Sequence, residues 1–406
     1  MAADGLSQAS VFFCGARGKE RSGSMIYLDN AATTMVKPAC VAQAVCAAMQ
    51  SFGGVGRGVH PASIAAGMAV YDARERLARL LGAPSPTRVA FSHNATMALN
   101  TVIAGLVPDG GVAVTTAASH NSVLRPLFRA RDERGVRVEV APIGPDGALD
   151  YDAYEALLAR GADLVAVTHA SNLTGDVYDA ARMARAAHEA GAVFVLDAAQ
   201  TAGCYPVDMG AIGADAVCFT GHKSLFGPQG TGGVAVAEGI EPAPLLEGGS
   251  GTHSFDERHP SFMPERLEAG TLNAHGLAGL AAGAAYLEER GIDAVAAEVR
   301  ALVERFEARV RAIDGVRVLG GGEGRRCGIV ALNVGDVDSG VVADRLAREF
   351  GICTRAGAHC APLMHRALGT EAQGAVRFSF SHLNTAAQAD EAADALARIA
   401  ADESAR

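Results

Sequence analysis

A single lysine stands between a histidine and a serine in the stretch FTGHKSLFGPQG, residues 219–230. It follows the apolar run ADAVCFT, which resembles a buried strand, and it precedes a glycine-rich turn. Burying an ammonium without a partner is costly, so Lys223 either caps a surface turn or lies inside for a chemical purpose. A buried lysine with a lowered pKa can form a Schiff base with an aldehyde.

A second candidate group lies one strand earlier. Asp197 ends an apolar run, Gln200 follows in LDAAQ, and Lys223 comes 26 positions after Asp197 (223 − 197). Taken alone, Asp197 is more simply a helix N-cap or a turn acid. A buried aspartate can, however, keep a pyridine nitrogen protonated and so make the ring an electron sink. The ordered set of Asp197, Gln200 and Lys223 therefore indicates pyridoxal phosphate, which needs a lysine imine and an acidic partner for its ring nitrogen.

A phosphate group requires backbone amides at the start of a helix, with hydroxyls beside them. The stretch FSHNATMALNTVIAGL meets this need, because Asn94, Ala95 and Thr96 open an apolar helix after the run RVAF. An ordinary helix N-cap explains the same residues equally well. His120, in AASHNSV, follows another strand end, where a flat imidazole could stack on a planar ring. A lone histidine is more often structural, so His120 counts only as part of this set.

The elements that must position these groups follow from the pattern of the middle of the chain. Strands are expected at 111–116, 137–143, 162–170, 192–199 and 214–220, with helices at 150–161 and 179–191 that close at glycine. This alternation predicts an α/β fold with a mainly parallel sheet flanked by helices. Such sheets bind ligands at the carboxyl ends of their strands, where polar residues recur: His169, Asn172, Asp197, Gln200, Thr220, His222 and Lys223.

The length of 406 residues suits two domains. From about Leu277 the pattern changes to one long helical stretch, followed by two apolar runs, a helix over 341–350, the run AVRFSFS and a last helix. This predicts a smaller α+β C-terminal domain. We place the boundary near residue 285: a large cofactor-binding domain at 25–285, whose first residues are expected to pack on the small domain, and the small domain at 286–406. Residues 1–24 are interpreted as a disordered leader or as codons ahead of a true start at Met25.

Composition narrows the class of protein. The apolar content of 49% and charged content of 20% are ordinary for a soluble globular protein. A net charge of −10 argues against nucleic acid or an anionic membrane as the main partner, and no apolar run is long enough to cross a bilayer. The sequence shows no export signal, and its eight cysteines form no CxxC pair. We therefore expect reduced thiols and a cytoplasmic location.

Taken together, several motifs make the chain resemble the class V, fold-type I pyridoxal-phosphate enzymes, in particular the cysteine desulfurases and the related selenocysteine lyases. The resemblance covers nearly the whole chain from Tyr27. It is carried by YLDNAATT, RGVHPAS, VTHASNLTG, LDAAQ, TGHKSLFGPQG, EAGTLN, RAGAHCAPL and VRFSFSHLNT.

The resemblance implies a role for each matching residue. Lys223 would carry the Schiff base, Asp197 would face the pyridine nitrogen, Gln200 would bond the phenolic oxygen, and His120 would stack on the ring. The phosphate would be held by Ala95, Thr96, Thr220 and His222, and by Thr271 of a neighbouring subunit, so the family pattern implies a homodimer. The substrate would be bound by Arg377 with Asn172 on its carboxylate, and by His60, Ala31 and Arg355.

The residue that separates desulfurases from transaminases in this resemblance is the cysteine of RAGAHCAPLMHRALGT. On composition alone, Cys360 would be one more buried thiol, but its place in the motif makes it the expected nucleophile, with Arg355 or His359 stabilising the thiolate. A zinc site built from Cys360, His359 and His365 lacks a second cysteine pair, so we expect no metal. A disulfide between Cys353 and Cys360 is disfavoured in the cytosol.

The resemblance therefore implies a desulfurase that converts L-cysteine to L-alanine and leaves a persulfide on Cys360, with His120 as a candidate acid. The short loop from Cys360 to Arg377 is similar to the short-loop group, which serves iron–sulfur cluster assembly and passes sulfur to an acceptor protein. Ala358 stands where that group often has histidine, which leaves the acceptor open, and Thr220 stands where serine is common. The alternatives are a selenocysteine lyase acting on L-selenocysteine, another class V aminotransferase or carbon–sulfur lyase, and a non-catalytic sulfur carrier.

Overall fold

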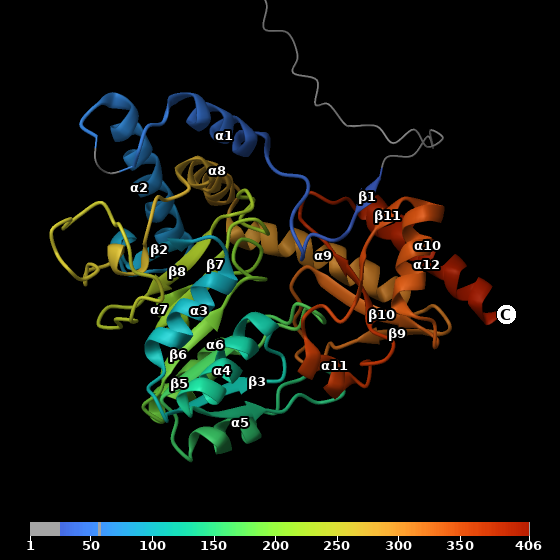
Figure 1. The fold of residues 1–406 in the computed structure, drawn as a ribbon. Coiled ribbons are helices and arrows are strands. Elements are labelled where there is room, and N and C mark those ends of the chain that lie inside the picture. The colour runs from blue at the N-terminus through green and yellow to red at the C-terminus, as the bar shows by residue number, and fades with distance from the viewer. Residues whose placement is uncertain (1–24, 56–57, 406) are drawn as a thin grey trace, which may run out of the picture.

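The computed structural model describes residues 25–55 and 58–405, so the expected leader at 1–24 lies outside the described residues. The described chain forms a large α/β part and a smaller α+β part that lie side by side (Figure 1). No helix within the described ranges is long and apolar enough to span a bilayer.

The large part is built on a seven-stranded sheet. Its strands, in spatial order, are β2 (Val89–Ser92), β8 (Gly232–Val236), β7 (Ala216–Thr220), β6 (Val193–Asp197), β5 (Leu164–Thr168), β3 (Val112–Thr116) and β4 (Arg137–Ala141). The strands from β7 to β4 pair in parallel, as the alternating pattern predicts. The exception is β8, which pairs antiparallel with both β2 and β7 and was not expected from the sequence.

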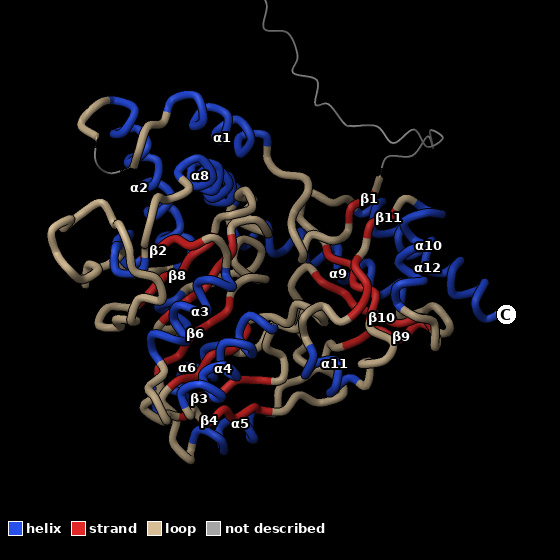
Figure 2. The backbone as a smooth tube through the Cα atoms, in the orientation of Figure 1, coloured by secondary structure: helices blue, strands red, loops and turns tan. Residues whose placement is uncertain are grey.

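Helices cover both faces of this sheet, and Figure 2 shows the red strands running between blue helices. Alternate residues of β5 enter different hydrophobic clusters: Val165 and Val167 pack in one, and Leu164 and Ala166 in the other. Because both sets of alternating side chains are buried, the sequence of such a strand is a continuous apolar run. The helices of this part are α1 (Ala39–Ser51), α2 (Pro61–Leu81), α3 (Ala95–Leu106), α4 (Asn121–Arg134), α5 (Tyr151–Leu158), α6 (Ala180–Glu189), α7 (Met209–Ile212) and α8 (Ala274–Arg290).

The small part has a four-stranded antiparallel sheet in the order β12 (Arg355–Gly357), β13 (Ala375–Ser379), β10 (Ile329–Val334) and β9 (Val316–Leu319). Its helices are α9 (Ile292–Val310), α10 (Ser339–Phe350), α11 (Pro362–Leu368) and α12 (Ala386–Ser404). The start of the described chain joins it, because β1 (Ile26–Tyr27) pairs in parallel with β11 (Ile352–Cys353), as the blue strand in Figure 1 shows. Leu28 is buried in the core of this part.

The long helical stretch expected after Leu277 consists of two helices. The structure divides this stretch into α8 and α9 at Gly291, whose φ of 81° lies in the left-handed region that side chains rarely adopt. The break lets Leu287 pack in the large core while Phe306 packs in the small one. The boundary expected near residue 285 falls inside α8.

Candidate active site

The carboxyl ends of neighbouring parallel strands form the floor of a cavity of about 200 Å³. Asp197 ends β6, Thr220 ends β7, and the turn after β7 carries Lys223. Because parallel strands finish at the same edge of a sheet, residues far apart in sequence meet there. The cavity lining includes nine of the residues predicted from the sequence: Ala95, Thr96, His120, Asn172, Asp197, Gln200, Thr220, His222 and Lys223.

The environment of Lys223 weakens its hold on a proton. Burial lowers the pKa of Lys223 to about 8, with Asp197 opposing this effect and the guanidinium groups of Arg377 and Arg355 adding to it. Asp197 is itself buried, which raises the pKa of its carboxyl, while the Ala199 N–H at 2.9 Å and the lysine charge act against that rise. An appreciable fraction of the Lys223 amine is therefore uncharged near pH 8, the form that can act as base or nucleophile.

The cavity offers unpaired donors to an anion at the start of α3. Asn94 caps this helix by accepting a hydrogen bond from the Met97 N–H at 3.0 Å, and Asn94, Ala95 and Thr96 line the cavity. The hydroxyl of Thr220 and Nδ1 of His222 are buried without a hydrogen-bond partner among the described residues. Buried polar groups are nearly always paired, so this combination fits a phosphate bound at the helix N-terminus.

Close packing of β8 sets the position of this helix start. A Cβ added at Gly232 would lie 2.7 Å from the Cα of Asn94, which is too close for any side chain. The glycine therefore lets the unexpected strand β8 approach the N-terminus of α3.

His120 lies at the N-cap of α4, where its Nδ1 accepts a hydrogen bond from the Ser122 N–H at 3.0 Å. Burial, together with the charges of Lys223, Arg355, Arg377 and Arg125, lowers the pKa of His120 to about 4. The ring is thus uncharged at neutral pH, with its proton on Nε2. This state suits stacking on a planar ring; the role of His120 as an acid stays a prediction.

Two arginines of the small part extend the site. Arg377 is 1% exposed, and its Nη2 pairs with Asp29 at 2.9 Å while its Nη1 donates to the Asn172 carbonyl at 2.9 Å. Its Nε is buried without a partner among the described residues, as is Oδ1 of Asn172. Arg355 stands directly opposite Arg377 across the β12–β13 pair, which places both side chains on the same face of the sheet. Two adjacent guanidinium groups suit the binding of a carboxylate.

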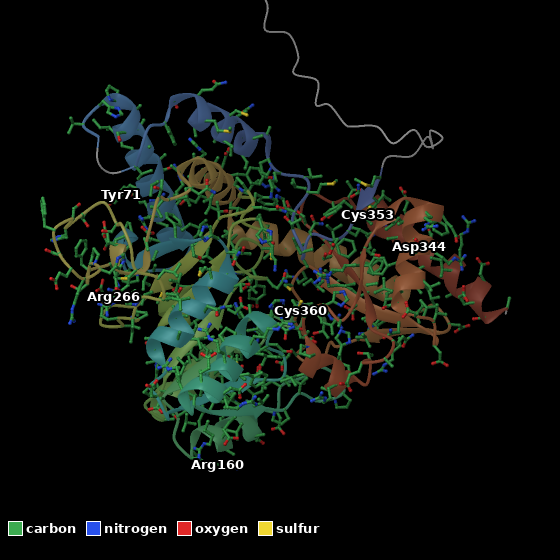
Figure 3. The ribbon with its side chains drawn as sticks, in the orientation of Figure 1. Tyr71, Arg160, Arg266, Asp344, Cys353 and Cys360 are labelled. Atoms are coloured by element: carbon green, nitrogen blue, oxygen red, sulfur yellow. The ribbon has the colours of Figure 1, made fainter. Side chains whose placement is uncertain are left out.

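The loop carrying Cys360 is fastened to the large part at two points. The Asn121 N–H donates to the Cys360 carbonyl at 2.9 Å, and Nδ2 of Asn172 donates to the His359 carbonyl at 2.6 Å. Cys360 is exposed, and Figure 3 shows it at the junction between the two parts. His359 and Cys360 have φ values of 50° and 55°, a strained conformation of the kind that clusters at functional sites. The loop thus carries an exposed cysteine, and its backbone is bonded to Asn172, which lines the Lys223 cavity, and to Asn121, the residue after His120.

His359, one of the two residues expected to stabilise this thiol, is packed away from water. It is 3% exposed, its Nε2 lies 3.2 Å from the Arg355 carbonyl, and its ring stacks on His365 with centroids 6.1 Å apart. Burial and the charge of Arg377 lower the pKa of His359 to about 3, so the ring is uncharged at neutral pH. Among the described residues, no group of three or more His, Cys, Asp and Glu side chains is placed to hold a metal ion.

The remaining predicted residues fall in two places. Ala31 is near the cavity, since its carbonyl accepts from Nε2 of Gln200 at 3.3 Å. His60 and Thr271 instead line a separate hollow of about 830 Å³, together with Gly249–Thr252, and within one chain they do not join the lining of the Lys223 cavity.

Sequence reasoning missed Asp29, the ion-pair partner of Arg377. The available signal was its place in the motif YLDNAATT.

A mainly parallel sheet with a lysine turn at its carboxyl edge, covered by a smaller α+β part, defines the fold-type I class. The family model described as Aminotransferase class-V matches residues 26–391, and the chain belongs to this family. It is 35% identical to a probable cysteine desulfurase of Methanothermobacter thermautotrophicus, over 92% of this chain and 94% of the relative. It is also 31% identical to a cysteine desulfurase of Haloferax volcanii, over 92% of this chain and 88% of that protein.

Two solved structures of cysteine desulfurases have the same fold as this chain. The apo structure of the cysteine desulfurase from Thermococcus onnurineus NA1 superposes with a TM-score of 0.88 at 32% identity, covering 93% of this chain and 95% of that one. The cysteine desulfurase CsdA from Escherichia coli superposes with a TM-score of 0.83 at 30% identity, with the same coverage.

Proposed function

We propose that this protein is a pyridoxal-phosphate-dependent cysteine desulfurase, which converts L-cysteine to L-alanine and leaves a persulfide on Cys360. The observation that supports this proposal is an exposed cysteine on a loop whose backbone is hydrogen-bonded to Asn121 and to Asn172, a residue of the Lys223 cavity lining. A transaminase has no need of a nucleophilic thiol at this position. The names of the relatives support the same activity.

The residues of the cavity fit the proposed cofactor. Asp197 would face the ring nitrogen, Gln200 would bond the phenolic oxygen, and the uncharged His120 would stack on the ring. The phosphate would be held by the first amides of α3 and by the unpaired groups of Thr220 and His222. When bound, pyridoxal phosphate withdraws electrons from the α-carbon of an amino acid.

The residues of the chain divide the remaining work. Arg377 and Arg355 hold the substrate carboxylate through charge-assisted hydrogen bonds. The uncharged amine of Lys223 takes the α-proton, which its pKa of about 8 permits near neutral pH. The sulfur of Cys360 then forms a bond to the substrate sulfur as the substrate carbon–sulfur bond breaks. The electron pair of that bond stays on carbon, which takes up a proton, so a thiol and L-cysteine become a persulfide and L-alanine without an external oxidant.

The decisive variant is Cys360→Ala. We expect it to bind the cofactor but to lose alanine formation from cysteine by ~10³-fold or more, because it lacks the nucleophile for sulfur. Selenium release from selenocysteine should persist in this variant, since a selenol is the better leaving group. Cys353→Ala, at a half-exposed thiol of the same segment, is the matched control and should remain active.

Mass spectrometry of the wild-type protein after reaction with cysteine, without reductant, should show one added sulfur on the peptide that contains Cys360. An added sulfur on a different cysteine, or normal turnover by Cys360→Ala, would overturn the proposed mechanism. A wild-type protein that uses selenocysteine but forms no persulfide from cysteine would instead indicate a selenocysteine lyase.

We further propose that the protein acts as a homodimer and passes its sulfur to an acceptor protein. The support for a dimer is that His60 and Thr271 line a separate hollow, where they could serve the cavity of a second copy. The support for a protein acceptor is the exposure of Cys360 on its short loop.

A further inference from the structure

The chain makes unusual use of lysine. Of its 35 basic residues only three are lysines, at positions 19, 37 and 223, so arginine fills the other 32 (35 − 3). Arginine and lysine are interchangeable at most solvated positions, but a compact ammonium and a planar guanidinium differ where geometry is tight. Lys223 has a chemical role in the proposed function. Lys37 has no role in the proposed function, but it lies next to the turn that carries Lys223.

The ammonium of Lys37 points at backbone and hydroxyl oxygens. Its Nζ lies 2.8 Å from the Thr34 hydroxyl and 3.4 Å from the His222 carbonyl. Within the described ranges Lys37 forms no ion pair, and burial alone lowers its pKa to about 8. A half-buried cation without a carboxylate costs stability, so its retention calls for a positive contribution.

Hydrogen-bond chemistry gives the Thr34 hydroxyl a fixed direction. An ammonium can only donate, so the hydroxyl oxygen must accept from Lys37. The hydroxyl proton is then directed to the carbonyls of His222 and Lys223, which both lie 3.1 Å away. The Thr34 N–H adds a further bond to the His222 carbonyl at 3.1 Å. Donors linked in a chain strengthen one another, so the Lys37 charge tightens the bonds that the hydroxyl makes.

We propose that Lys37 is a positioning residue, which acts through the Thr34 hydroxyl to hold the turn that carries Lys223. The lysine amine reaches the cavity from this turn. The titratable and charged groups that face it are Asp197, Arg377, Arg355, Cys327, Cys204, His120 and His222. If the turn loosens, the amine gains water and moves away from these fixed groups. Arginine cannot replace Lys37, because its fork does not fit a single short contact to one hydroxyl.

This inference rests on the proposed role of Lys223, but its test reads the amine directly. The full-length protein, freed of cofactor, is labelled with trace acetic anhydride across a pH series, and the Lys223 peptide is quantified by mass spectrometry. With so few lysines, each label is assigned without ambiguity. If the protein shows no desulfurase activity, the labelling result for Lys223 still tests the role of Lys37. If the pH midpoint of Lys223 labelling does not change in the variants, the inference about Lys37 fails while the desulfurase proposal is unaffected.

In Lys37→Met we expect the midpoint of Lys223 labelling to rise, because a solvated amine holds its proton more tightly. A rise of half to one pH unit would lower the uncharged fraction at pH 8 by about two- to fivefold. Thr34→Val should reproduce this change, Thr34→Ser should not, and the Lys37→Met/Thr34→Val double variant should add nothing to either single variant.

Lys37→Arg decides whether the compact ammonium is required, and we expect the midpoint to rise in this variant too. Wild-type labelling in Lys37→Arg would show that charge alone acts and would overturn the inference. So would unchanged labelling in folded Lys37→Met or Thr34→Val, with folding checked by circular dichroism. If a Lys37 variant does not fold, the comparison of Thr34→Val with Thr34→Ser still tests the inference.

Discussion

Lys223 has a lowered pKa mainly because burial removes water from its ammonium, and in addition because its charged neighbours are unequal in number and sign. One carboxylate, Asp197, stabilises the ammonium, while burial and two guanidinium groups oppose it. The resulting pKa of about 8 keeps part of the amine reactive under ordinary conditions. Two predictions follow from this single residue.

The first prediction concerns the attachment point of the cofactor. Borohydride treatment of the cofactor-loaded protein should join the cofactor permanently to Lys223, because this is the amine at the cavity that receives it. Peptide mapping by mass spectrometry should find the added mass there, with the peptides containing Lys19 and Lys37 as internal controls. A yellow Lys223→Ala protein that still desulfurates cysteine would contradict the assignment.

The second prediction concerns pH and stability without cofactor. The folded pKa of Lys223 is about 8 against an ordinary 10.5, so between these values the unfolded chain binds more protons and stability rises with pH. Lys223→Met has no ammonium to bury, so below pH 8 its free energy of unfolding should be higher than that of the wild-type protein. The difference between the two free energies should shrink as pH rises from 8 to 10.5, by at most about 1.4 kcal/mol per pH unit. Denaturant unfolding of both proteins at each pH measures the difference, and a constant difference would contradict the argument.

At the scale of elements, the N-terminus of α3 is the proposed phosphate-binding end of the cavity, so its stability and its affinity for phosphate should be linked. The Asn94 side chain caps the helix, and β8 fixes its backbone through Gly232. Asn94→Ala should lower the free energy of unfolding by about 1 kcal/mol, since the Met97 N–H loses its acceptor.

The same change should weaken cofactor binding, because the frayed first turn no longer presents its amides to the phosphate. Asn94→Ser keeps a capping oxygen and is the matched control. Fluorescence titration of pyridoxal phosphate into the cofactor-free proteins measures the affinity. Equal affinities for the alanine and serine variants would show that the first turn of α3 does not hold the phosphate.

At the scale of the whole molecule, one face of α2 is left uncovered by the residues that the structure describes. Ile64, Met68 and Tyr71 lie on one side of this helix and are 50%, 68% and 54% exposed, and Figure 3 shows Tyr71 at the outer surface. Exposed apolar faces of this kind mark protein interfaces. A second copy of the chain is the proposed occupant, because His60 and Thr271 belong to the same region.

The corresponding prediction is that active sites are shared between two copies. Met68→Glu should shift the protein from dimer to monomer in analytical ultracentrifugation and reduce desulfurase activity, without unfolding it. Mixing Lys223→Ala chains with Thr271→Ala chains should restore some activity, because one of the two sites in a mixed dimer has both residues intact. A fully active wild-type monomer would rule out shared sites.

The sequence alone predicted the local elements of this protein better than the contacts between distant segments. The parallel strands and the polar residues at their ends were predicted correctly, because period and apolar runs depend on neighbours a few positions away. Asp197, Gln200 and Lys223 were expected at one site, and they line one cavity, since strands that run in parallel bring their ends to one edge.

Only the tertiary structure decided the contacts between distant segments. Arg377 meets Asp29 across 348 positions, and the backbone of Cys360, in the small part, is hydrogen-bonded to Asn121 of the large part. The antiparallel β8 joins the sheet through pairing that no local pattern encodes. His359 is uncharged because packing removes it from water, a property that its place beside Cys360 does not reveal. Such features depend on which surfaces the folded chain brings together, so residue types and spacing alone cannot specify them.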